Sequence, residues 1–239
     1  MVSSAGPGAG PHQKSRRGTG SMSDKRHIWD RYANWNEVGS LEDPRAIRVK
    51  ITGLPANRWE PNREVEGLAP ALEAILADCQ ARRGNRGTVV DFGCGLGRNQ
   101  PFLRSRFDRL VGFDLPEMAA KLRADPAAAG YDAILDDRAA LLAEPVDVVF
   151  DSVVWQHIVD ADYTTRMVDE LLGLPGWRWL ISFTNAGVHA GRRERGLALG
   201  TAILRDRGWA EILCLEDTQT FRGPHMLRVL RRPDPPAAG

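Results

Sequence analysis

Two short stretches hold the residues whose types and spacing could do chemistry. Thr88–Asn99 reads TVVDFGCGLGRN, an apolar run that carries the acid Asp91 and continues into glycines at positions 93, 95 and 97. Leu110–Asp114 reads LVGFD, a second apolar run that ends on an acid. An apolar strand, a glycine turn, a helix and a second strand ending in an acid form a βαβ unit of the kind that holds a nucleoside-type cofactor.

The glycines and the second acid have separate tasks in such a unit. Gly93 and Gly95 lack a Cβ atom where the backbone must turn sharply and approach a ligand. The helix after Gly97 directs its free amide groups toward the same place. Asp114 lies at the tip of the second strand, where a carboxylate can accept hydrogen bonds from both hydroxyls of a ribose.

The spacing of these residues separates two classes of cofactor. A nicotinamide dinucleotide site typically reads G-x-G-x-x-G, with the helix amides on a pyrophosphate. Here the pattern is D-x-G-x-G-x-G, with Asp91 two residues before the first glycine. An acid at that position suits a cofactor with a cationic amino-acid end and no pyrophosphate. The sequence therefore resembles the class I, Rossmann-like S-adenosylmethionine (SAM) methyltransferases, because VVDFGCGLGRN is similar to that family's first motif and VGFD to its second.

The resemblance implies how the strand ends would hold the cofactor, since ligands of such sheets collect there. Gly93 and Gly95 would frame the methionine part of SAM, and Asp91 would orient its ammonium group directly or through water. Asp114 would bind the ribose, and Leu115 directly after it would also contact the cofactor.

Two neighbouring acids after the third predicted strand are candidates for the adenine contact. Asp137, with Leu141 four residues later, resembles the family's D-A-x-x-L pattern, whose acid meets the adenine amine. Asp136 fits equally well by register, so the sequence does not separate the two acids. For either acid, the alternative role is that of a helix N-cap.

The segment after the fourth predicted strand, Asp151–Ile158, reads DSVVWQHI and in this family borders both the methionine tail and the methyl acceptor. Asp151 would lie near the cofactor, and Trp155 would lie further out against the acceptor. His157 could be a general base that takes a proton from a hydroxyl; the alternative is that it only braces the loop. The segment differs from the Asn/Asp-Pro-Pro-aromatic motif of DNA, RNA and glutamine methyltransferases, which argues against those acceptors.

Further contacts are expected after the fifth predicted strand and from a helix before the first. Asn185 could orient the acceptor, and its alternative role is turn formation. Lys25–Val38 reads as an amphipathic helix that carries Tyr32 and Trp35. It resembles the cap that closes over SAM in many small-molecule methyltransferases, where Tyr32 would contact the cofactor and Trp35 the acceptor. The alternative is that these rings pack on the sheet edge.

The pattern from Thr88 onward alternates strands and helices. It predicts an α/β fold: a Rossmann-like, doubly wound, mostly parallel seven-stranded sheet with helices on both faces and an N-terminal helical cap. The predicted strands span residues 88–92, 110–113, 131–135, 146–150, 178–183, 209–215 and 225–230. Predicted helices span residues 68–79, 116–123, 138–142, 160–173 and 192–207, with one more after the glycine turn. The resemblance implies that the last strand runs antiparallel beside the fifth.

The predicted organisation has four parts. These are a disordered extension (residues 1–23), a helical cap and lid segment (24–86), a SAM-binding core (87–232) and a tail (233–239). The extension is rich in small and basic residues and has too few large apolar side chains to bury a core.

Composition narrows the class of protein. The chain has 239 residues, of which 43% are hydrophobic and 26% charged, as expected of one globular α/β domain. A formal charge of +1 does not suggest a DNA- or rRNA-binding surface, and no apolar run approaches the ~20 residues that span a bilayer. The three cysteines match no zinc or disulfide spacing, so we expect a cytoplasmic protein with free thiols.

These observations predict a SAM-dependent methyltransferase that acts on a small molecule, needs no metal and releases S-adenosylhomocysteine (SAH). The alternatives are a regulatory protein that binds SAM without methyl transfer, a peptide or tRNA methyltransferase, and a nicotinamide-dependent oxidoreductase. The glycine spacing argues against the oxidoreductase. The acceptor atom, O, N or C, and the oligomeric state are not indicated by the sequence.

Overall fold

The computed structural model of the chain describes residues 68–152, 154–155, 161–185, 193–220 and 223–234. The expected helix at Lys25–Val38, with Tyr32 and Trp35, lies outside the described residues, as does His157. The boundary between the predicted extension and cap also lies outside them.

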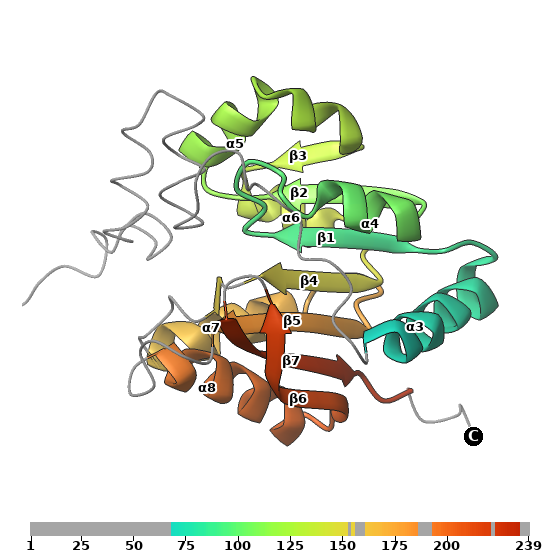
Figure 1. Cartoon of the computed structure of the whole chain (residues 1–239), viewed down its shortest axis with the longest axis vertical. Coiled ribbons are helices and arrows are strands. Elements are labelled where there is room, and N and C mark those ends of the chain that lie inside the picture. Colours follow the sequence, from blue (N-terminus) through green and yellow to red (C-terminus); the bar gives the residue numbers. More distant parts are fainter. Residues whose placement is uncertain (1–67, 153, 156–160, 186–192, 221–222, 235–239) are drawn as a thin grey trace, which may run out of the picture.

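The described residues form a seven-stranded sheet with the order β3-β2-β1-β4-β5-β7-β6 (Figure 1). The strands are β1 (Thr88–Phe92), β2 (Arg109–Phe113), β3 (Ala133–Leu135), β4 (Val148–Ser152), β5 (Trp179–Asn185), β6 (Ala210–Thr220) and β7 (Gly223–Arg231). Strands β1 to β5 pair in parallel, and β7 runs antiparallel between β5 and β6. This topology confirms the predicted Rossmann-like sheet, including the antiparallel last strand beside the fifth.

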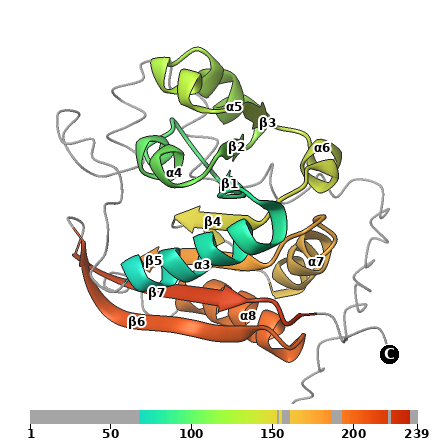
Figure 2. The ribbon, with the colours of Figure 1, turned by 90° about the vertical axis from the view of Figure 1, so that its right-hand side faces the viewer.

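Helices lie along both faces of the sheet (Figure 2). They are α3 (Leu68–Arg83), α4 (Gln100–Arg106), α5 (Pro116–Arg123), α6 (Arg138–Ala143), α7 (Ala161–Leu171) and α8 (Arg193–Asp206), with a 3₁₀ helix, η4 (Pro126–Gly130). In β1, Val89 packs with side chains of α3 and α4, whereas Val90 packs with side chains of α6, α7 and α8. All five residues of β1 and of β4 are buried, as expected of parallel strands that are covered on both faces. Within the described part of the chain, no helix is both long and apolar enough to cross a membrane.

Several element boundaries differ from the predicted ones. In β4 and β6 the backbone pairing continues through polar residues, where the apolar pattern of the sequence has already stopped. Strand β4 spans Val148–Ser152, two residues later than predicted, so Asp151 lies inside the strand. Strand β6 continues through a polar stretch to Thr220, where its backbone still pairs with β7. Strand β3 begins only at Ala133, because Tyr131, the first residue of the predicted strand, is the C-cap of η4 and its amide donates to the Ala128 carbonyl oxygen.

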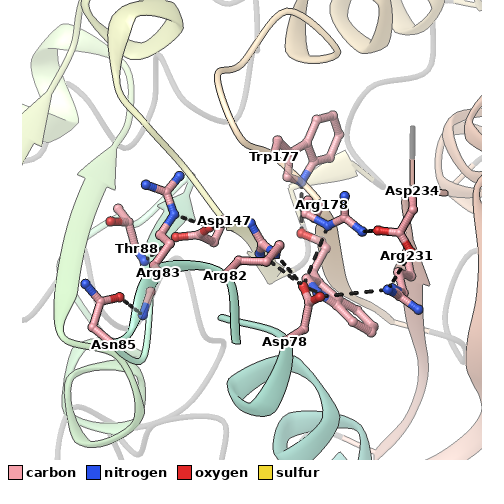
Figure 3. Close-up of polar contacts among 12 residues, drawn as sticks. Asp78, Arg82, Arg83, Asn85, Thr88, Asp147, Trp177, Arg178, Arg231 and Asp234 are labelled. Atoms are coloured by element: carbon pink, nitrogen blue, oxygen red, sulfur yellow. Dashed lines mark hydrogen bonds and ion pairs between the residues drawn. The ribbon is translucent and has the colours of Figure 1, made fainter. Parts of the chain in front are cut away.

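An ion-pair cluster joins α3 to the amino ends of the central strands (Figure 3). Asp147 precedes β4, is fully buried and accepts hydrogen bonds from the Thr88 amide (2.9 Å) and from Arg83 Nε (2.7 Å). Arg82 Nη1 lies 3.2 Å from the same carboxylate. One turn earlier in α3, Asp78 accepts a hydrogen bond from Trp179 Nε1 (2.7 Å) in β5. The carboxylates of Asp78 and Asp147 therefore hold this helix against the amino edge of the sheet.

We expect Asp147→Ala to lower the free energy of unfolding by about 3 kcal/mol, because it leaves the Arg83 guanidinium and the buried Thr88 amide without their acceptor and removes one of the two carboxylate partners of Arg82. The measurement is urea unfolding at neutral pH. The matched control is Asp108→Ala, which removes an exposed pair with Arg86 and should cost less than about 1 kcal/mol. Equal losses in the two variants would contradict the role given to Asp147.

Candidate functional site

The turn after β1 is built from glycines in the left-handed region of backbone conformation. Gly93, Gly95 and Gly97 have φ angles of 71°, 56° and 75°. A Cβ atom at Gly93 would lie 2.1 Å from Val154 Cγ2, so a larger residue would clash there as well as being strained. The amides of Gly93 and Cys94 donate to the carbonyl oxygen of the last residue of β2 at 2.8 and 3.1 Å. The turn is therefore fixed against the carboxyl end of β2.

Asp114 follows β2 and is buried against this turn. Its Oδ2 accepts a hydrogen bond from the Gly95 amide at 2.6 Å, and its Oδ1 accepts one from the Leu115 amide at 2.7 Å. Burial raises the pKa of Asp114 to about 6, although the two amides oppose this shift. Since each carboxylate oxygen can accept two hydrogen bonds, both oxygens retain capacity for a ligand hydroxyl.

Asp91 lies in β1 and is almost completely buried, with 1% of its surface exposed. Its Oδ2 accepts a hydrogen bond from the Tyr131 hydroxyl at 2.7 Å. Its Oδ1 is buried and has no hydrogen-bond partner among the described residues. Burial raises the pKa of Asp91 to about 7, with a further rise from the charge of Asp114, while Tyr131, Arg98 and Asn99 lower it. An orphaned buried carboxylate oxygen is costly, so it marks a place where a ligand donor is needed.

Asp151 is the third buried carboxyl at this edge and lies beside Phe92 in the sheet register. Its Oδ2 accepts from Ser182 Oγ at 2.7 Å, and its Oδ1 accepts from the Val154 amide at 2.8 Å. Burial is the largest cause that raises its pKa to about 7. Asp151 thus fixes the segment whose Val154 side chain packs over the glycine turn.

Two residues that the sequence did not single out complete the surroundings of Asp91. Arg98 follows the last glycine of the turn, is 7% exposed and donates from Nη2 to Ser152 Oγ at 3.1 Å. A basic residue inside a turn of small and apolar residues was a signal that could have found it. Tyr131 reaches Asp91 from the far end of η4, and nothing in the local sequence indicates that contact.

The arrangement favours a cationic ligand. Three buried carboxyls and one buried guanidinium lie around one glycine turn, at the edge to which the arrowheads of β1, β2 and β4 point (Figure 1). A pyrophosphate would meet carboxylates here, whereas an ammonium group and ribose hydroxyls would meet acceptors. The described residues contain no group of three His, Cys, Asp or Glu side chains that could hold a metal ion.

The two candidates for the adenine contact each have a partner within the protein. Asp136 pairs with Arg123 at 2.8 Å, and this partner lowers its pKa. Asp137 is the N-cap of α6 and accepts from the Ala140 amide at 2.8 Å. The Asp114 amide donates to the carbonyl oxygen at the end of β3 at 3.2 Å, which brings both acids near the candidate ribose ligand. The adenine contact of either acid stays a prediction.

The structure gives less support to the predicted acceptor contacts than to the predicted cofactor contacts. Trp155 is fully buried, and its ring packs against Gly200 of α8, where a Cβ atom would lie 2.3 Å from Cζ3. This ring belongs to the apolar core between β4, α7 and α8. Asn185 is the last residue of β5 and is paired with His225 of β7. Acceptor contacts by Trp155 and Asn185 stay predictions, as do those of the residues outside the described part.

Comparison with known proteins agrees with this architecture. Magnesium protoporphyrin IX methyltransferase from Synechocystis, solved with bound SAM, aligns with a TM-score of 0.54 and 17% identity over 90% of this chain and 100% of that chain. N-methyltransferase NodS from Bradyrhizobium japonicum, solved in complex with SAH, aligns with a TM-score of 0.54 and 14% identity over 85% of this chain and 98% of that chain. No family model and no curated protein matches the sequence. The chain has the fold of the class I SAM-dependent methyltransferases, which confirms at the level of the fold the resemblance predicted from its two motifs.

The buried carboxyls make stability depend on pH. Asp114 has a pKa of about 6, and Asp91 and Asp151 have values of about 7, whereas an unfolded chain has aspartate values near about 4. Between about pH 4 and pH 7 these three groups bind more protons in the folded protein than in the unfolded chain, so their contribution to the free energy of unfolding falls as pH rises. We expect Asp151→Asn to weaken this fall in urea unfolding experiments, because one of the three groups no longer titrates. Asp162→Asn, at an exposed position of α7, is the control, and an unchanged pH dependence in Asp151→Asn would contradict the assignment.

Proposed function

We propose that this chain is a SAM-dependent methyltransferase that moves a methyl group to an O, N or C nucleophile of a small molecule and releases SAH. The observation that carries the proposal is the pair of buried carboxyls on either side of the glycine turn. Asp114 retains acceptor capacity on both oxygens, and Asp91 has a buried oxygen without a partner. The fold supports the same conclusion, because its solved neighbours include methyltransferases with SAM or SAH bound.

Each residue of the proposed site has a distinct part. Asp91 Oδ1 accepts a hydrogen bond from the ammonium group of the cofactor, and Asp114 accepts from the ribose hydroxyls. The turn at Gly93 and Gly95 lets the backbone approach the methionine part. Arg98, held by Ser152, supplies a positive charge beside these carboxyls. The buried surroundings keep water away from these contacts and strengthen them.

The cofactor supplies an electrophilic methyl carbon, made reactive by its sulfonium charge. The protein would contribute positioning: a site that holds donor and acceptor together would account for much of the acceleration. His157 takes a proton from the acceptor when the acceptor is a hydroxyl or a protonated amine. Trp155, Asn185 and Trp35 contribute to the acceptor site in this proposal. The buried free thiols of Cys79 and Cys94 are consistent with a cytoplasmic enzyme.

The experiment that tests the proposal is calorimetric titration of the purified protein with SAM, SAH and NADH in parallel. Micromolar binding of SAM and SAH, without binding of NADH, is expected, and it would justify screening acceptors for SAH release. Binding of NADH alone, or of none of the three, would overturn the proposal. Binding of SAM without methyl transfer to any small molecule, peptide or tRNA would favour a regulatory SAM-binding protein.

We expect Asp114→Ala to weaken SAM binding by about 100-fold or more, because the ribose loses charge-assisted hydrogen bonds and the Gly95 amide loses its acceptor. Calorimetry measures the affinity, and circular dichroism checks that the variant is folded. The exposed Asp108→Ala serves as the control and should bind SAM like the unaltered protein. Full affinity in Asp114→Ala would exclude the ribose assignment.

We expect His157→Ala to lower turnover by roughly 100-fold with little change in SAM affinity, because a general base acts on the acceptor and does not hold the cofactor. The measurement is SAH release at saturating SAM over a range of pH, once an acceptor is known. Unchanged turnover would show that His157 has a structural role.

A further inference from the structure

Tyr131 connects the segment before β3 to the carboxylate of β1. It is the C-cap residue of η4, and its amide donates to the Ala128 carbonyl oxygen. Its side chain passes beside the glycine turn, and its hydroxyl donates to Asp91 Oδ2 at 2.7 Å. Burial and nearby carboxyls raise the pKa of Tyr131 well above its usual value, so the hydroxyl keeps its proton and acts as the donor.

The ring of Tyr131 is held by close packing against two glycines. A Cβ atom at Gly97 would lie 3.2 Å from Tyr131 Cε2, and one at Gly112 would lie 3.1 Å from Cδ1. Side chains at these positions would displace the ring, so the glycine turn and β2 are shaped to admit it. The direction of the hydroxyl is therefore set by the fold rather than by the hydrogen bond alone.

The contact determines what Asp91 can offer to a ligand. The hydroxyl hydrogen-bonds to Oδ2, and Oδ1 is the oxygen left without a partner among the described residues. A hydrogen bond donated to a carboxylate also favours its ionised form. Without that donor, a carboxyl that is 1% exposed would lose one of the groups that stabilise its charge.

We propose that Tyr131 is a positioning residue of the cofactor site: its hydroxyl orients the Asp91 carboxyl and stabilises its charged form, so that Oδ1 can accept a hydrogen bond from a cationic ligand. The inference rests on the proposed function, because the ligand is taken to be the ammonium end of SAM.

Other charged and titratable groups face Asp91 from each neighbouring element. Asp114 after β2 raises its pKa, and Arg98 in the turn lowers it. Asp151 in β4 and Cys94 in the turn are also coupled to it electrostatically. Burial is the largest cause of the raised pKa of Asp91, and together with these neighbours it leaves the value at about 7. The loss of a single donor therefore shifts the ionisation of Asp91 within the range that experiments near neutral pH cover.

The first test follows Asp91 itself in the protein without ligand. Carbon-13 NMR of the aspartate carboxyl groups gives its titration, with Asp91→Asn used to assign the signal. We expect Tyr131→Phe to raise the apparent pKa of Asp91 by about one unit, because the ring remains and only the donor is lost. Tyr163→Phe, which removes the hydroxyl of a tyrosine buried in the opposite apolar layer, should leave the titration unchanged. An unchanged Asp91 titration in Tyr131→Phe would overturn the proposal.

The second test measures SAM affinity by calorimetry as a function of pH. We expect Tyr131→Phe to bind SAM about fivefold more weakly than the unaltered protein at about pH 7, and with nearly the affinity of the unaltered protein at about pH 9, where Asp91 is ionised in both proteins. In an Asp91→Asn background, Tyr131→Phe should weaken binding no further. Weakening by the same factor at every pH, or in the Asp91→Asn background, would indicate a merely structural role and overturn the proposal.

The two tests separate this inference from the proposed function. If the unaltered protein binds no SAM at any pH, the proposed function fails, and the NMR titration still decides whether Tyr131 controls the ionisation of Asp91. If SAM binds but Tyr131→Phe behaves like the unaltered protein, only the positioning role fails.

Discussion

The hydrogen bond from the Gly95 amide to the Asp114 carboxylate, 2.6 Å long, is the contact on which the proposed site depends. It joins the turn after β1 to the residue after β2, and the carbonyl oxygen of Phe113 accepts two further amides of the same turn. The residues at the end of β2 thus fix the conformation of the glycine turn by accepting hydrogen bonds from its amides. A carboxyl can stay buried here because backbone amides take the place of water as its donors. The Asp114 carboxylate therefore both fixes the glycine turn and, in the proposed function, binds the ligand.

Local patterns in the sequence are enough to predict most of the sheet, but not the contacts that give the site its electrostatics. The apolar runs locate β1 and β2 closely, and the D-x-G-x-G-x-G spacing identifies the turn, because both signals lie within a few residues of chain. Asp91 and Tyr131 are forty positions apart, and their contact depends on how η4 packs, which no periodicity encodes. Asp151 is polar yet lies inside β4, since Ser182 of β5 supplies its donor. A local sequence pattern does not predict contacts between residues that are far apart in the chain.

The carboxylates at the two edges of the sheet differ in how many cationic partners they have. At the amino edge, Asp147 is matched by Arg82 and Arg83, and Asp78 is approached by Arg82, Arg178 and Arg231, so each carboxylate has cationic partners (Figure 3). At the carboxyl edge, carboxyls outnumber the buried guanidinium, and one oxygen has no partner among the described residues. Folding alone would favour the first arrangement at both edges. In the proposed function, the imbalance at the second edge keeps acceptors available for a ligand.

Strand β6 lies at one end of the strand order, and its pairing with β7 shifts register between Glu211 and Leu213 and again between Leu215 and Thr218. An uninterrupted edge of eleven residues would offer a regular row of amide and carbonyl groups to another polypeptide. Irregularities of this kind bend and twist a strand, which spoils the flat ladder that a second sheet would need. The exposed Ile212 lies between the two residues at which the first shift occurs. The bulged course of β6 therefore makes this strand a poor template for pairing with another sheet at the place where an apolar side chain is exposed.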